Sequence, residues 1–273
     1  MGKKAQVKQQ KSKESEMNKG KEANLDLSKQ KRNELNRLID KLLKVSSIIV
    51  GTGKIRDSHV EMEKLLEKIV EIENEVNVGF PSRNRATMKS LTDWMLENGS
   101  KIDGVEICEF EGYDYGLRSL KDINQNDLMI SVPRKLMMTT EFARKSELEY
   151  LMQNDALLAH MPSMSLALFL LLEKFRGNSF WEPYLNSLPS SYNTVMYFTL
   201  DELDALKGSP TYEPALKQCQ NIARQYGYLY SLFYNSNDAA SAILRKVFTY
   251  EQYSFSSIKR SSSVEQLQAR PLA

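Results

Sequence analysis

The residue types most often used for metal binding or covalent catalysis are sparse in this chain. It has two cysteines, Cys108 and Cys219, and two histidines, His59 and His160. The cysteines lack the paired spacing of a zinc site, and a disulfide scaffold needs more of them. His59 begins a helical segment with no second ligand near it, so we expect it at the surface or at a helix cap. His160 has no carboxylate or nucleophile at catalytic spacing. The sequence therefore predicts no metal site and indicates no catalytic residue.

The stretch from Tyr113 to Met138 is more informative, because it predicts two β-strands that follow each other closely. Gly116 provides backbone freedom at a point where a side chain would be in the way. Residues 128–132 alternate in the period of a half-buried strand. Pro133 lacks an N–H and should end the pairing of that strand. On the residues alone, the stretch predicts a β-hairpin with a glycine in its first strand.

The order of these residues resembles the opening of a SET domain: an aromatic-Gly-Leu-Arg run, Asp-Ile, a polar turn, and an apolar strand ending in Val-Pro. Downstream, NSFWEPYLNSLP at residues 178–189 resembles the helical insert of the subclass related to the RuBisCO large-subunit lysine methyltransferase. Within that subclass, the sequence is most similar to the protein-histidine N-methyltransferases that act on actin. The similar segments are MGKK at 1–4, WMLENG at 94–99, VPRKLMMT at 132–139 and ARQYGY at 223–228. The resemblance is strong from about Phe80 to Tyr253 and weak before it.

This resemblance implies an α+β fold, namely the N-terminal part of a SET domain, with small antiparallel β-sheets, a helical insert and N-terminal helices. It implies S-adenosylmethionine as cofactor and a histidine of actin as the methyl acceptor. The cofactor would lie beside the backbone of Tyr113, Asp114 and Tyr115. An arginine before the helix that contains Trp94 would contact the cofactor carboxylate in a charge-assisted pair. Arg85 is the first choice and Arg83 the second, because the spacing to that helix differs by one residue.

The sequence departs from the family pattern after Tyr253. The tail at 254–273 is rich in serine and charge, and it lacks the family's second cofactor arginine and its Asn-His pair. We therefore expect this polypeptide to lack the C-terminal half of SET and the helical substrate-binding domain. We expect it to bind S-adenosylmethionine weakly or not at all and to show little methyl transfer. The alternatives are a non-catalytic SET fragment that binds a protein partner, and a protein-lysine methyltransferase of the same subclass.

Hydrophobic periodicity predicts the elements that would position such a site. Two amphipathic helices carry apolar stripes. The stripes are Leu35, Leu38, Ile39, Leu42 and Leu43, and Met62, Leu65, Leu66, Ile69 and Ile72. Further helices are predicted at 87–98, 141–153, 163–175, 201–207 and 214–234. The expected divisions are a disordered basic tail at 1–24, helices at 25–101, the first half of the SET β-core at 102–138, the helical insert at 139–253, and a divergent, disordered tail at 254–273.

Composition narrows the class of protein further. The chain has 273 residues, 41% of them hydrophobic, and a formal net charge of +2. A charge this small gives no reason to expect a nucleic-acid partner. No apolar run approaches the roughly 20 residues needed to span a bilayer, so no membrane association is expected. We expect a cytoplasmic protein, since two unpaired cysteines fit a reducing compartment, with access to the nucleus through the basic tail.

Overall fold

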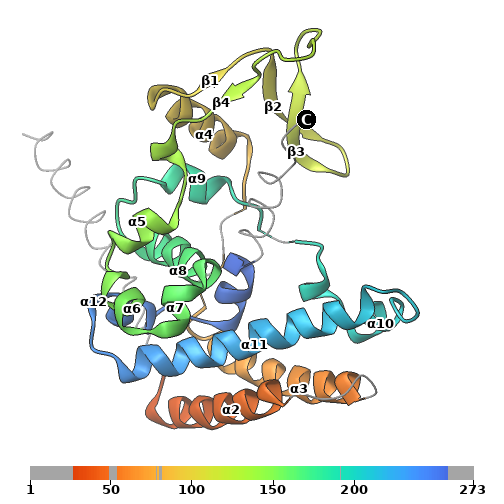
Figure 1. The fold of residues 1–273 in the computed structure, drawn as a ribbon, viewed down its shortest axis with the longest axis vertical. Helices are drawn as coiled ribbons and strands as arrows, with labels where there is room; N and C mark the ends of the chain where they lie inside the picture. Colours follow the sequence, from red (N-terminus) through yellow and green to blue (C-terminus); the bar gives the residue numbers. More distant parts are fainter. Residues whose placement is uncertain (1–26, 49–53, 78, 80–81, 191, 258–273) are drawn as a thin grey trace, which may run out of the picture.

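The computed structural model describes residues 27–48, 54–77, 79, 82–190 and 192–257. Helices dominate it, and a small β part stands at one end, farthest from the first two helices (Figure 1). The helices are α2 Lys29–Ser47, α3 Ile55–Glu73, α4 Arg85–Glu97, α5 Thr140–Arg144, α6 Glu149–Asn154, α7 Ala156–His160, α8 Pro162–Phe175, α9 Glu182–Ser187, α10 Leu200–Asp204, α11 Tyr212–Asn235 and α12 Ala239–Leu244. The strands are β1 Lys101–Ile102, β2 Val105–Phe110, β3 Asp114–Ser119 and β4 Ile130–Ser131, and the short 3-10 helices are η2 Arg134–Leu136 and η3 Val195–Tyr197. The basic tail at 1–24 lies outside the described residues.

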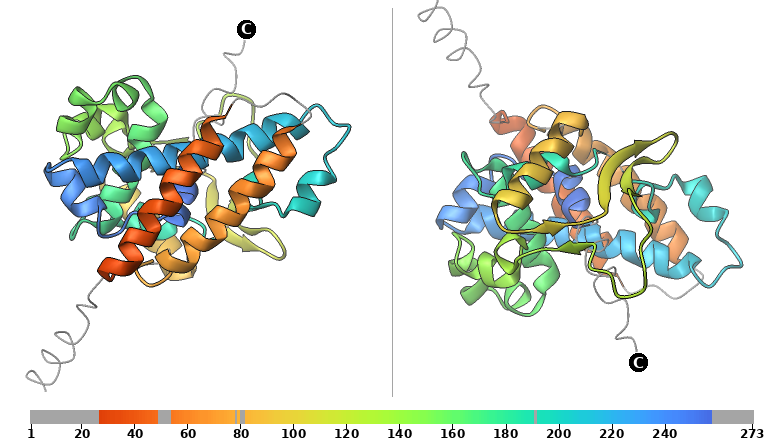
Figure 2. Two further views of the ribbon diagram at one scale, coloured as in Figure 1. Left: turned by 90° about the horizontal axis from the view of Figure 1, so that it is seen from below. Right: turned by 90° about the horizontal axis from the view of Figure 1, so that it is seen from above.

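The predicted apolar stripes bring α2 and α3 together against α11, as the view from below shows (Figure 2). Both stripes are buried or half-buried in the main core, which confirms the two predicted helices. Contact with α11 is unusually close at Gly227, where an added Cβ would lie 2.9 Å from Leu43 Cγ. Only a residue without a side chain fits between these two helices without movement of Leu43.

The insert differs from its prediction at one point. A single helix was expected over 141–153, but the structure has α5 and α6 with a break between them. In the break, Ser146 Oγ donates to Ala143 O at 2.7 Å and accepts from Leu148 N at 3.2 Å. The serine side chain therefore competes for the backbone groups that a continuous helix would use. The predicted apolar helix at 163–175 is confirmed as α8, which is buried along most of its length.

The β part forms two separate antiparallel sheets of two strands each in the described residues. Strand β3 pairs with β2, placing Gly116 opposite Cys108, whereas β4 pairs with β1. The predicted hairpin between the strands near 115 and 130 is therefore wrong. The strand expected over 128–132 is reduced to Ile130–Ser131, and Leu128 is exposed. Alternation predicted strand character here, but it carries no information about the strand partner.

The end of the described chain is helical. Residues 250–257 form a helix that follows α12, and Tyr253, Phe255 and Ser256 within it are buried. The change in composition at Ser254 therefore falls inside a packed helix, and the boundary expected at 253 does not coincide with its end. Residues 258–273 lie outside the described part.

Candidate functional site

The structure places Arg83 beside the turn between β2 and β3. Its Nε donates to Asp114 Oδ2 at 2.9 Å, and its guanidinium lies 5.6 Å from the centre of the Tyr115 ring. An arginine in this geometry offers further N–H donors in a planar fork. Asp114 and Tyr115, two of the three residues predicted to lie beside the cofactor, are thus brought together with an arginine. The side chain of the third, Tyr113, is 87% exposed.

Arg85, the first-choice arginine, lies elsewhere. It is the first residue of α4, whose start is fixed by a capping box between Asn84 and Thr87. It lines a hollow of about 890 Å³ between α4 and the β2–β3 sheet, and Tyr115 lines the same hollow. Much of that hollow is formed by apolar side chains, including Met88, Ile107 and Leu117. The arginine that contacts the turn is therefore Arg83, the second choice.

The turn itself has an unusual backbone. Gly112 and Asp114 adopt positive φ angles of 76° and 63°, which glycine and aspartate tolerate better than most residues. A side chain at Gly116 would be in the way, as expected. A Cβ there would lie 3.1 Å from the Phe110 ring, so the glycine leaves space for a cross-strand aromatic side chain.

A cavity of about 400 Å³ lies between the segment that precedes α4, the link after α9 and the helix at 250–257. It is lined by Asn77, Gly79, Ser190, Tyr192, Tyr197, Glu251, Gln252 and Phe255. The rings of Tyr192 and Phe255 pack at 5.2 Å between centres. Burial raises the pKa of Tyr192, and the positive charge of Arg83 opposes this effect.

A row of hydrogen bonds runs along one wall of this cavity. Lys174 Nζ donates to Gln252 Oε1 at 2.9 Å, and Gln252 Nε2 donates to Asn77 Oδ1 at 3.1 Å. Asn77 Nδ2 in turn donates to Glu251 Oε2 at 2.5 Å. Because an ammonium group only donates, Lys174 fixes the direction of every bond in the row. Burial lowers the pKa of Lys174 to about 7.

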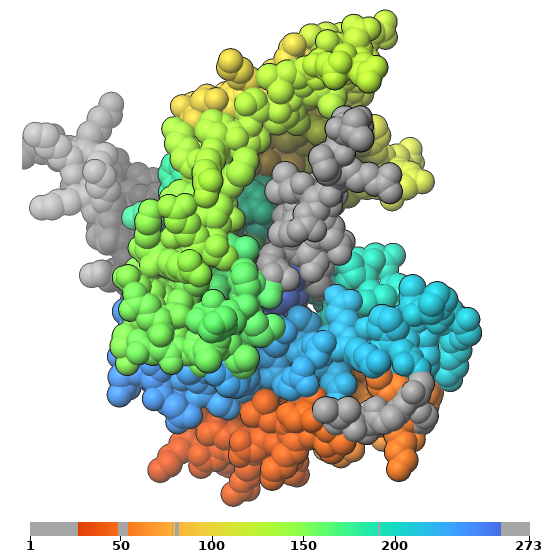
Figure 3. Space-filling view, in the orientation of Figure 1, coloured from red at the N-terminus to blue at the C-terminus, as the bar shows by residue number. Residues whose placement is uncertain are grey.

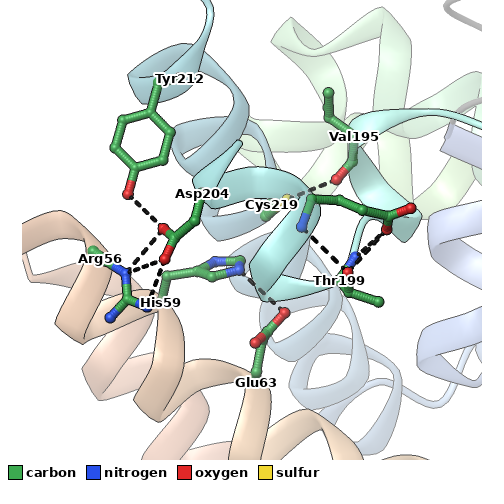
Figure 4. A network of polar contacts seen from close by, with 9 residues as sticks. Arg56, His59, Glu63, Val195, Thr199, Asp204, Tyr212 and Cys219 are labelled. Carbon is green, nitrogen blue, oxygen red and sulfur yellow. Dashed lines mark hydrogen bonds and ion pairs between the residues drawn. The ribbon is translucent and has the colours of Figure 1, made fainter. Parts of the chain in front are cut away.

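A second polar network joins α3 to α10 (Figure 4). Arg56 forms a two-pronged ion pair with Asp204, and Tyr212 Oη donates to the same carboxylate at 3.2 Å. Hydrogen bonding and charge from Arg56 hold the pKa of Asp204 well below its usual range. This network fastens helices together and opens onto neither cavity.

His59 belongs to this second network and corrects an expectation. It was predicted at the surface or at a cap, but it is buried, with Nε2 3.2 Å from Glu63 Oε1. Burial lowers its pKa. A signal for this was present, because His59 and Glu73 follow the spacing of the buried residues Met62, Leu66 and Ile69 on α3. His160 is exposed at the end of α7.

The described residues lack two kinds of feature. No group of three or more His, Cys, Asp or Glu side chains there is arranged to hold a metal ion. None of the helices in this part of the chain combines the length and hydropathy that a bilayer crossing requires.

Comparison with known proteins points to one family. No protein-family model matches the chain. The actin-histidine N-methyltransferase of Canis lupus familiaris is 37% identical over 253 residues, which are 93% of this chain and 42% of that protein. The Homo sapiens protein of the same name is 37% identical over 93% of this chain and 41% of its own length. The chain thus spans about two fifths of the length of these relatives.

Solved structures give the fold. The SET domain of LSMT bound to lysine and AdoHcy matches 63% of this chain and 37% of its own, with a TM-score of 0.54 and 22% identity. Rubisco LSMT bound to sinefungin and monomethyllysine matches 63% of this chain and 39% of its own, with a TM-score of 0.53 and 21% identity. Both matches confirm the predicted fold class of helices with small antiparallel sheets. The chain therefore shares the fold of these SET-domain structures over the matched part, and its sequence is similar to those of the actin-histidine N-methyltransferases.

Proposed function

We propose that the chain takes part in S-adenosylmethionine-dependent methyl transfer to a histidine side chain of actin. The observation that carries this proposal is the contact of Arg83 with Asp114 and Tyr115, at the start of β3. The names of the relatives support the substrate, and the relatives are similar to almost the whole of this chain. In the family pattern, the arginine and the turn lie on the cofactor side of the site.

The residues present suit that cofactor. Arg83 offers the planar donor fork that pairs with a carboxylate, and its present partner, Asp114, is itself a carboxylate. Tyr192 and Phe255 provide apolar faces, while Asn77 and Gln252 provide polar groups. A volume of about 400 Å³ lies within the usual range of small-molecule sites. Arg83 would hold the carboxylate, and the backbone of residues 113–115 would lie along the ligand.

The chain's contribution to the reaction is to orient the two reactants. When bound, the cofactor supplies an activated methyl group on sulfur. A histidine acceptor is mostly neutral and nucleophilic at pH 7, since its unperturbed pKa is about 6.5. The remaining requirement is that the histidine be aligned with the methyl group, and such alignment accounts for a large part of the rate in these transfers. Arg83 and the turn fix one reactant from the side of the β part.

The test is an NMR titration of the ¹⁵N-labelled chain with S-adenosylhomocysteine up to millimolar concentration, which detects weak binding. We expect shifts at the amides of residues 113–115. Arg83→Ala should raise Kd by about tenfold or more, because a charge-assisted hydrogen bond is lost. Arg85→Ala, the matched control, should leave Kd nearly unchanged. An absence of shifts at the turn would overturn the cofactor site, and a larger effect of Arg85→Ala would reverse the assignment.

The substrate is tested separately with actin peptides in which the acceptor is histidine, alanine or lysine. Methyl transfer from radiolabelled S-adenosylmethionine should be confined to the histidine peptide, and because cofactor binding is expected to be weak, long incubations at high enzyme concentration are needed. Transfer to the lysine peptide instead would favour a protein-lysine methyltransferase. Binding of the peptides without transfer would favour a non-catalytic partner-binding role.

A further inference from the structure

Glu73 is the last residue of α3 and is a carboxylate enclosed by the protein. It is 2% exposed and continues the apolar stripe of its helix. A buried carboxylate is costly unless its oxygens accept hydrogen bonds. The groups that satisfy Glu73 come from two other parts of the chain, so this side chain joins three segments.

Each carboxylate oxygen accepts one hydrogen bond. Tyr226 Oη, from α11, donates to Oε1 at 2.5 Å, and the backbone N–H of Tyr250 donates to Oε2 at 2.7 Å. Tyr226 is itself fully buried and stacks on Phe248 with 5.6 Å between ring centres. These contacts hold the residues just before the last described helix.

The contact with Tyr250 occurs where the helix at 250–257 begins. The first N–H groups of a helix lack partners within it, and an acceptor oxygen from another segment can satisfy one of them. Glu73 therefore caps this helix from outside. Along the helix, Glu251, Gln252 and Phe255 form part of the wall of the 400 Å³ cavity. Tyr250, which Glu73 caps, thus belongs to the same short helix as these cavity-wall residues.

We propose that Glu73 is a positioning residue that holds the helix at 250–257, and with it the cavity wall, and that its grip weakens when it loses its proton. The inference rests on the packing of the helix and does not depend on the identity of the ligand. It adds to the candidate site a residue that touches neither the cavity nor the turn.

The surroundings of Glu73 determine its charge. Burial raises the pKa of Glu73 to about 8, against the lowering effects of the hydrogen bonds from Tyr226 and Tyr250, and Glu251 raises it further. A small cavity lies on the other side of the Glu73 side chain. It is lined by Glu73 and by Arg32, Arg245, Lys246, Tyr230 and Tyr234. That cavity measures about 20 Å³, enough for roughly one water molecule.

The direction of the pH effect follows from the pKa of Glu73 in the buried state and in the exposed state. Between the ordinary value of 4.5 and about 8, the exposed carboxyl is ionised while the buried one keeps its proton. Opening of the helix therefore releases a proton, and rising pH favours the open state. The opening equilibrium should increase by up to about tenfold per pH unit in this window, level off above it, and be unaffected below it.

The experiment is hydrogen exchange of the amides of residues 250–253 in the full chain at pH 6 and pH 8, corrected for the intrinsic pH dependence of exchange. The wild-type protection should fall by up to about a hundredfold over these two units. Glu73→Gln, which can still accept from Tyr250, should remove this dependence. Glu71→Gln, on the exposed face of the same helix, should retain it.

A second measurement needs no variant. The ¹³C signal of the Glu73 carboxyl should titrate with a midpoint near 8 in the wild-type chain, and a midpoint near the ordinary value of 4.5 would overturn the proposal. Equal pH dependence of protection in the wild type and in Glu73→Gln would also overturn it. Because neither measurement involves a cofactor, their failure is distinct from failure of the proposed function.

Discussion

The helical body and the β part of this molecule are stabilised to very different degrees by their own residues. In the body, Leu42 of α2, Leu168 of α8 and Tyr226 of α11 are fully buried in one hydrophobic core. Across residues 101–131, Val105 alone is buried, and Leu117, Leu120 and Leu128 are 57%, 61% and 62% exposed. The β part occupies the upper end of the space-filling view, remote from α2 and α3 (Figure 3).

The difference extends to hydrogen bonding. Helices satisfy their backbone internally, whereas each strand of a two-stranded sheet has one edge without a strand neighbour, as the pairing of the described residues shows. Paired strands with little apolar cover are marginally stable. The body can therefore fix the cavity wall, whereas Arg83 contacts Asp114 and Tyr115 in a region with little core of its own.

The largest effect should separate the two regions directly. Leu168→Ala removes a fully buried side chain from α8 and should lower the free energy of unfolding by about 2–5 kcal/mol. Leu117→Ala, in β3, removes a side chain that is already largely in water and should cost under about 0.5 kcal/mol. Urea unfolding followed by circular dichroism measures both. Equal losses would mean that the β part has a core comparable to that of the body.

A smaller effect should appear at the boundary, where Lys174 ties α8 to the cavity wall. Its pKa is lowered to about 7 by burial, so the folded chain binds its proton less tightly than the unfolded chain does. Stability is therefore lost as pH falls from about 10.5 towards about 7. Between pH 7 and pH 9.5, the free energy of unfolding of the wild type should rise by about 1–2 kcal/mol more than that of Lys174→Met, after allowance for the partial exposure of Lys174.

The same unfolding experiment on both proteins at the two pH values gives this difference. Glu213→Gln, on the surface of α11, serves as a control for general charge effects. A pH profile of the wild type parallel to that of the methionine variant would show that the ammonium is well solvated.

The smallest effect lies within the β part. Phe110→Ala removes the ring that covers Gly116 and should destabilise the β2–β3 pair by about 0.5–1 kcal/mol. The loss should be seen as faster amide exchange at residues 105–110 and 114–119, with exchange in α8 unchanged. Phe110→Leu should lose less. If α8 also exchanged faster, the two regions would form one cooperative unit.

Much of the body could be predicted from the sequence, because its helices carry their own periodic signal. The stripes of α2 and α3, the apolar α8 and the long α11 all follow the residue patterns. Strand partners could not be predicted in this way. Residues near 115 and 130 are close in sequence and both have strand character, yet each pairs with a strand that precedes Gly112 in the chain.

The site was predictable in part. The turn at Asp114 and Tyr115 lies beside an arginine, as the family resemblance implied. Sequence spacing favoured Arg85 over Arg83, but the direction of a side chain depends on where α4 begins, and Arg85 lies inside the helix while Arg83 lies before it. The burial of Glu73 was not predicted, because it is a lone acidic residue in an apolar stripe. The hydrogen-bonded row from Lys174 to Glu251 joins residues far apart in sequence, so no local pattern could indicate it.

The close approach of α2 and α11 has a consequence for how this protein can change over evolutionary time. Since position 227 has space only for a hydrogen atom facing Leu43, the two positions are not free to drift independently. A lineage that acquires alanine at 227 should show a shorter side chain at 43. Paired substitutions of this kind among homologous sequences would record the contact without any structure being determined.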